Sequence, residues 1–221
     1  MIDYPKLETS LPRQYQNSLK PFHDFLAGQS RRETRKIAAL IGSARYRKVM
    51  VQWRAYLTEG IVSGERPAFA DMPVRELADN RIWKAYRRVM KEGGAIDDSS
   101  PPAALHELRI TCKKLRYLQE FFQSLYPADE IKALIKSLKA FQNVLGEFQD
   151  TEVQSQAILE FGREMAAAGV APVETHMAMG MVAETILQRQ ETARAEFNDR
   201  FREFSDAGVQ TAFEKLFRNQ G

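Results

Sequence analysis

Apolar residues recur at intervals of three and four through almost the whole chain, and no stretch alternates apolar and polar residues over the length of a strand. This period is typical of amphipathic α-helices, because residues three and four apart share one face of a helix. Leu, Ala, Glu, Lys, Arg and Gln, which favour helices, are also abundant. The sequence therefore predicts an all-α fold built from antiparallel helical bundles.

Breakers and capping residues set the expected limits of the helices. Residues 1–12, with two prolines, are expected to form a loose lead-in before a helical domain over residues 13–221. Gly28 and Gly169 are expected to end helices and Gly146 to break or bend one, while Ser30, Ser43 and Ser100 are expected to cap the helices that follow them. The resulting helices cover about 13–27, 30–41, 43–59, 74–92, 101–126, 129–145, 147–168, 172–205 and 209–217, and a loop covers 60–72.

Cations form a stripe on the helix expected over 101–126. His106, Arg109, Lys113 and Arg116 follow one another at spacings of three, four and three, which places them on one face. Leu108, Cys112 and Leu115 fall on another face and predict a buried side. The buried side of such a helix would pack against the core and so hold the cationic face in a fixed position.

Other helices repeat this arrangement of cations. Arg81, Lys84 and Arg88 share a stripe, as do Lys132, Lys136 and Lys139, and Arg45 and Lys48 share a face with Gln52. The stripe at residues 81–91 is equally typical of an ordinary solvated surface helix. Near Arg45 and Lys48, Trp53 and Tyr56 are expected to belong to the core or its edge.

The formal net charge of +3 conceals a strong division along the chain. Residues 1–146 carry 25 Lys and Arg against 16 Asp and Glu, a net of +9, whereas residues 147–221 carry 7 against 13, a net of −6. A polyanion is therefore the expected partner of the basic part, 13–146. Phosphate suits these residue types, because Arg offers forked donors, Lys a mobile charge and His a donor that becomes cationic below neutral pH.

Several other classes of chemistry find no support in the sequence. The three histidines are far apart, and no phosphate-binding loop, dinucleotide fingerprint or nucleophile elbow is present. The lone Cys112 is expected to be a small buried hydrophobe, and no apolar run predicts a membrane span or signal peptide. Glu147 and Asp150 would either hold a metal near bound phosphate, cap a helix, or pair with Arg or Lys. We expect a cytoplasmic protein that has no cofactor and is not an enzyme.

The stretch LHELRITCKKLRYLQEFF resembles the signature of the CHAD family, the conserved histidine α-helical domain. The later stretch FQNVLGEFQD resembles the second signature segment of the family, which it matches at Gln142, Leu145, Gly146 and Asp150. The resemblance implies an all-helical fold whose basic helices line a groove or partial pore, and it implies binding of inorganic polyphosphate, often at polyphosphate granules. It also extends the expected binding residues on the central helix to Lys114 and Tyr117.

The chain departs from the family pattern near its N-terminus. Complete members have an earlier histidine–arginine helix related to the central one, and the basic residues after His23 do not match its spacing. The sequence therefore predicts a shortened form of the domain, or half of a site that a homodimer completes.

Other partners would also suit a cationic helical face. One is a nucleic acid, although no reading motif or exposed aromatic platform is evident in the sequence. Another is an acidic protein that docks on a scaffold, such as the acidic C-terminal third of a second copy. A phosphohydrolase that uses Glu147 and Asp150 is a further alternative.

Overall fold

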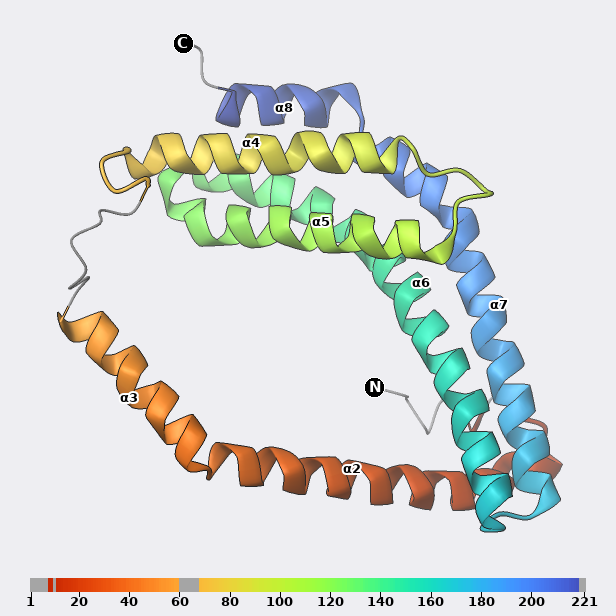
Figure 1. Cartoon of the computed structure of the whole chain (residues 1–221). Helices are drawn as coiled ribbons and strands as arrows, with labels where there is room; N and C mark the ends of the chain where they lie inside the picture. Colours follow the sequence, from red (N-terminus) through yellow and green to blue (C-terminus); the bar gives the residue numbers. More distant parts are fainter. Residues whose placement is uncertain (1–7, 10, 60–67, 219–221) are drawn as a thin grey trace. The chain divides into compact units, whose positions relative to one another are not determined.

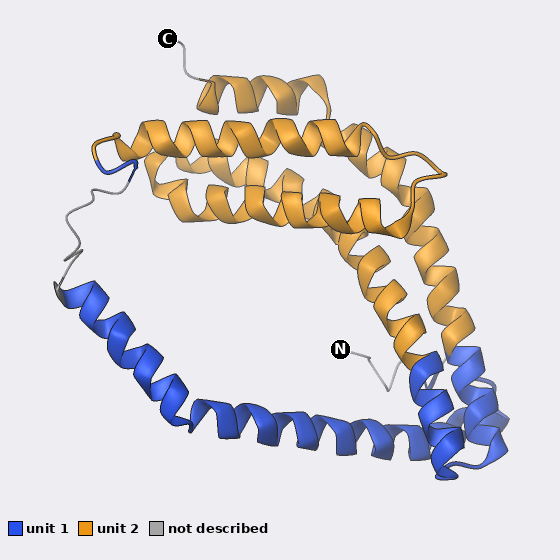
Figure 2. Cartoon of the chain, in the orientation of Figure 1, with its two compact units in different colours: residues 1–70, 159–182 blue, residues 71–158, 183–221 orange. Residues whose placement is uncertain are grey.

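The computed structural model describes residues 8–9, 11–59 and 68–218. These residues are predominantly helical and contain no strand, which confirms the all-α prediction (Figure 1). The chain divides into two compact units, one of residues 1–70 and 159–182 and one of residues 71–158 and 183–221 (Figure 2). The predicted lead-in 1–12 and loop 60–72 lie largely outside the described residues.

The first unit contains the helices η1 (Arg13–Leu19), α2 (Lys20–Ile41) and α3 (Ala44–Glu59), and the adjoining ends of α6 and α7. Its small core forms where the start of α2 meets the end of α6. The Phe161 ring lies 6.4 Å from that of Phe22 and 5.7 Å from that of Phe25. The Thr175 hydroxyl donates to the Ser18 carbonyl at 2.7 Å, which ties α7 to η1.

The predicted boundary at Gly28 and Ser30 is wrong, because α2 runs without a break from Lys20 to Ile41. The break occurs earlier, where Pro21 occupies the first turn of α2 and the preceding residues form the 3-10 helix η1. Pro is tolerated there because first-turn N–H groups have no partner within the helix. The predicted cap at Ser43 is confirmed, since its hydroxyl accepts from the Tyr46 N–H at 3.1 Å.

The predicted core placement of Trp53 and Tyr56 is also wrong. Their side chains are 55% and 54% exposed, and their rings stack on each other with centroids 5.7 Å apart. Large apolar residues along the end of α2 and along α3 are exposed as well: Ile37, Leu40, Ile41, Val49, Met50, Val51 and Leu57. The helical period was interpreted correctly, but the apolar side of α3 is not covered by the described part of this chain.

The second unit contains α4 (Val74–Gly93), α5 (Pro102–Phe122), the 3-10 turn η2 (Gln123–Leu125), most of α6 (Ala128–Ala168) and α7 (Val173–Phe204), and α8 (Ala207–Phe217). Their apolar faces meet in one core rich in phenylalanine. The Tyr86 ring of α4 stacks on Phe213 of α8 at 3.8 Å, and Phe141 of α6 lies 5.5 Å from Phe204 of α7.

A buried polar contact fixes the end of the α5 segment against α4. The Tyr126 hydroxyl donates to the Asp79 carboxylate at 2.8 Å, and Arg75 pairs with the same carboxylate at 3.1 Å. The guanidinium of Arg75 also lies 4.1 Å from the centre of the Tyr126 ring. This contact sets where the chain turns from α5 into α6, the two helices that build the site below.

Two predicted boundaries in this unit are wrong. Gly146 does not break a helix, because α6 continues through it to Ala168. Ser100 does not cap α5, since its side chain bonds to Asp97 in the preceding turn and Pro101 occupies the cap position. The predicted stop at Gly169 is confirmed, and its φ of 62° explains why glycine stands there. Among the described residues, none of the helices has the length and apolar character that a membrane span requires.

Candidate anion-binding site

Helix α5 has the two predicted faces. Leu108, Cys112 and Leu115 are fully buried in the core, and burial raises the pKa of the Cys112 thiol, consistent with an inert hydrophobe. Arg109 and Arg116 lie beside this face with side chains only 22% and 25% exposed. Packing of α5 against the core therefore holds these cations in place along its contact with α6.

Three of the predicted cations converge on one cleft between α5 and α6, which we call the cationic cleft. It has a volume of about 400 Å³, and α5 contributes Arg109, Lys113 and Arg116 to its wall. The facing wall comes from α6 and consists of Gln142, Asn143, Gly146, Glu147 and Asp150. Both segments of the sequence signature thus meet in the same cleft, one on each side.

Contacts with α6 and with the next turn of α5 orient the arginines of the cationic cleft. Arg116 donates from Nη1 to the Gln142 side-chain oxygen at 3.0 Å, and its Nε lies 3.7 Å from Glu120. The Tyr117 ring centre lies 5.1 Å from the same guanidinium. Arg109 is held more loosely, with Nη2 3.8 Å from Asp150. Each guanidinium thus has donors to spare, because it carries five N–H groups, and the buried Nε of Arg116 has no hydrogen-bond partner among the described residues.

Gln142 carries a donor that the described residues leave unsatisfied. Its side chain is only 7% exposed, and its oxygen must face Arg116 because a guanidinium can only donate. The amide nitrogen then has no hydrogen-bond partner among the described residues. A buried donor without a partner costs about 1–3 kcal/mol.

A second hollow, the lysine groove, adjoins the cationic cleft. It has a volume of about 590 Å³ and is lined by Glu120, Gln123, Lys132, Ile135, Lys136 and Lys139. Glu120 joins the two hollows, since its carboxylate lies 3.0 Å from Lys139 and 3.7 Å from Arg116. The structure therefore places six predicted cations in a row of two hollows along the α5–α6 contact.

The remaining predicted residues lie outside these hollows. His106 is half-buried beyond Arg109, where its Nδ1 forms a hydrogen bond with the side-chain oxygen of Gln149 on α6. Lys114 is exposed on α5, Arg81, Lys84 and Arg88 are exposed on α4, and Arg45 and Lys48 are exposed on α3 in the other unit. Arg88 is paired with Glu92. A role for these residues stays a prediction.

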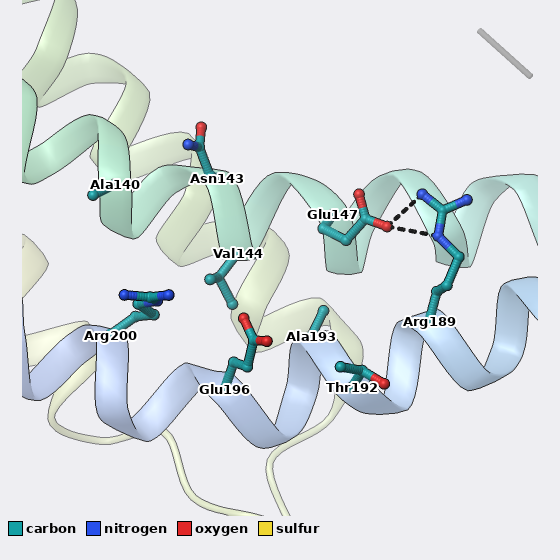
Figure 3. A pocket seen from close by; sticks show the side chains of 9 residues that line it. All are labelled: Ala140, Asn143, Val144, Glu147, Arg189, Thr192, Ala193, Glu196 and Arg200. Atoms are coloured by element: carbon teal, nitrogen blue, oxygen red, sulfur yellow. Dashed lines mark hydrogen bonds and ion pairs between the residues drawn. The ribbon is translucent and has the colours of Figure 1, made fainter. Parts of the chain in front are cut away.

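Glu147 and Asp150 pair with arginines, one of the alternatives that the sequence left open. Glu147 accepts two hydrogen bonds from Arg189 of α7, and Asp150 lies near Arg109. The Arg189 pair lies in a further cleft between α6 and α7, shown in Figure 3. The described residues include no cluster of His, Cys, Asp and Glu that is able to hold a metal ion.

Sequence reasoning missed several polar residues that shape the site. Gln142 was quoted only as a match to the signature, and Asn143, Gln149 and Glu120 were not singled out. The spacing of Glu120, four residues after Arg116, was a usable signal for a helical ion pair. The contacts of Gln142 and Gln149 join helices that are separate in sequence, so no local pattern indicates them.

The comparison with family models returns the CHAD domain, matched over residues 4–159. The chain belongs to the CHAD family. The match covers both signature segments, and so it covers both walls of the cationic cleft. The end of α6 and the whole of α7 and α8 in this CHAD chain lie beyond the matched residues. A comparison with curated proteins finds no match.

Proposed function

We propose that this CHAD chain binds inorganic polyphosphate, without enzymatic turnover, in the cationic cleft and the lysine groove. The observation that carries the proposal is the convergence of Arg109, Lys113 and Arg116 on one cleft that a second helix closes from the other side. CHAD domains are associated with polyphosphate binding, which supports the same ligand. A cytoplasmic location at polyphosphate granules belongs to the proposal.

The balance of charge along the α5–α6 contact supports an anionic ligand. The two hollows are lined by six cations, Arg109, Lys113, Arg116, Lys132, Lys136 and Lys139, and three carboxylates, Glu120, Glu147 and Asp150. Neighbouring like charges destabilise a fold, so an anion that neutralises the excess would be favoured. Two adjoining hollows suit a linear polymer better than a single phosphate, because successive phosphates would each meet their own cations.

Titration with polyphosphates of defined length tests the proposal. We expect the affinity to fall steeply between low and high salt, because a polyanion releases counterions when its charges are neutralised. We also expect tripolyphosphate to bind more weakly than chains long enough to reach from the cleft into the groove. Equal affinity for all lengths, or affinity that does not respond to salt, would contradict the proposed track. Release of orthophosphate in the presence of Mg²⁺ or Mn²⁺ would contradict the absence of turnover.

One observation favours single-stranded nucleic acid as a second candidate. Tyr117 and Phe121 follow the cations of α5 and are 53% and 79% exposed, so their rings are available for stacking on bases. Competition between single-stranded RNA and polyphosphate at equal phosphate concentration separates the two. Displacement of polyphosphate by RNA at equal concentration would favour the nucleic acid.

A homodimer is a further proposal. The exposed apolar residues of α2 and α3 support it, because such faces are typical of surfaces that another chain covers. We expect light scattering to give a dimer for the parent and a monomer for Leu40→Glu combined with Trp53→Glu. A monomeric parent would remove the dimer without affecting the cationic cleft.

A further inference from the structure

A carboxylate in the wall of the cationic cleft would oppose an anionic ligand. Glu147 lines the cleft together with Arg109, Lys113 and Arg116, and its side chain is 43% exposed. A negative charge at this place repels phosphate oxygens at a distance where solvent screens only part of the interaction. The site therefore needs some means of offsetting this charge.

Arg189 of α7 offsets the negative charge of Glu147. Its Nε and Nη2 donate to the same Glu147 oxygen at 3.0 and 2.6 Å. Figure 3 shows this guanidinium reaching the carboxylate from the α7 side, across a cleft of about 500 Å³ between α6 and α7. Glu147 and Asn143 line both clefts, whereas Arg189 lines only the one between α6 and α7.

We infer that Arg189 sets the affinity of the cationic cleft for polyphosphate by neutralising Glu147, without touching the ligand itself. The inference rests on the proposed function. It assigns a role to the acidic C-terminal third of the chain, since Arg189 lies beyond the residues that the family model matches. Arg189 acts on the site because it pairs with Glu147, a carboxylate in the wall of the cationic cleft.

Two single variants and their double variant test the inference. We expect Arg189→Ala to weaken binding of long-chain polyphosphate about fivefold, because it leaves the Glu147 charge without its partner. Glu147→Gln should bind at least as tightly as the parent, because it removes the repulsive charge. In the Glu147→Gln background, Arg189→Ala should then change the affinity by less than about twofold, since nothing is left to neutralise.

Arg200→Ala is the matched control. Arg200 lies on the same helix and lines the same α6–α7 cleft, but its partner is Glu203 at 3.0 Å, outside the cationic cleft. Its removal changes the net charge by the same amount and should leave the affinity within about twofold of the parent.

Each outcome decides one question. An unchanged affinity for Arg189→Ala, or an equal loss for Arg200→Ala, would overturn the inference. The same loss from Arg189→Ala in the Glu147→Gln background would also overturn it, because Arg189 would then act on the ligand or on the fold directly. Failure of the parent itself to bind polyphosphate would instead overturn the proposed function.

Discussion

Replacing Arg109, Lys113 and Arg116 together by alanine is expected to weaken polyphosphate binding by about a hundredfold or more. Each of these side chains lines the cationic cleft, and a hydrogen bond to a charged group contributes about 1.5–3 kcal/mol, part of which solvent and salt remove. If the three side chains together contribute about 3 kcal/mol to the binding free energy, their loss weakens the affinity about a hundredfold. Isothermal titration with long-chain polyphosphate at low salt measures the loss.

A control with the same change in net charge separates local contacts from long-range attraction. Arg202, Lys215 and Arg218 are exposed on the surface of the same unit, where they pair with Asp199, Glu130 and Glu214. Replacing these three by alanine should lower the affinity only severalfold, because they line neither hollow and solvent and salt screen exposed charges. If both triple variants bind equally well, polyphosphate does not use the cationic cleft.

Circular dichroism tests whether the cleft variant is still folded, so that weaker binding is not caused by unfolding. The three arginine and lysine side chains of the cleft lie beside the core, whereas Leu108 and Leu115 of the same helix fill it. Alanine also favours helix more than the residues it replaces. We therefore expect the helical signal of the cleft variant to stay close to that of the parent, and the unfolding temperature to fall by no more than the loss of the Arg116–Gln142 hydrogen bond explains.

The central helix could be predicted in detail because the spacing of residues within one helix determines which of them share a face. The spacing of Leu108, Cys112 and Leu115 fixes the buried side of α5, and the position of the cations then follows from helix geometry. The pairing of α5 with α6 was anticipated only as a bundle of neighbouring helices. Which residues meet across that contact, such as Arg116 and Gln142, depends on the register of two helices and has no local signal.

Errors in the predicted fold have a different cause. Gly28 was taken as a helix end and Gly146 as a break or bend, yet both lie inside continuous helices. One glycine in a long helix costs about 1 kcal/mol, and tertiary packing exceeds that cost. Trp53 was assigned to a core from its period alone. A periodic pattern shows which side of a helix is apolar, but it does not show whether the same chain covers that side.

Gly146 leads to the second large prediction, because nothing in the packing of the protein requires a glycine there. It lies within the continuous helix α6, where an added Cβ atom would meet no described atom within 4 Å apart from its chain neighbours and the backbone of its own helix. It also lines the cationic cleft between Gln142 and Asp150. The chain therefore carries a residue unfavourable to helix at a point where a side chain would enter the cleft that we propose binds polyphosphate.

Gly146→Leu is expected to raise the free energy of unfolding by up to about 1 kcal/mol, because leucine favours helix, while it weakens polyphosphate binding about tenfold or more. Gly180 provides the matched control, since it also lies inside a helix with open space around it but does not line the cleft. Gly180→Leu should give a similar gain in stability and leave binding unchanged. Chemical denaturation and titration of both variants measure the two effects separately. Undiminished binding by Gly146→Leu would show that the phosphate chain does not pass over this turn of α6, because a leucine side chain there cannot avoid the cleft.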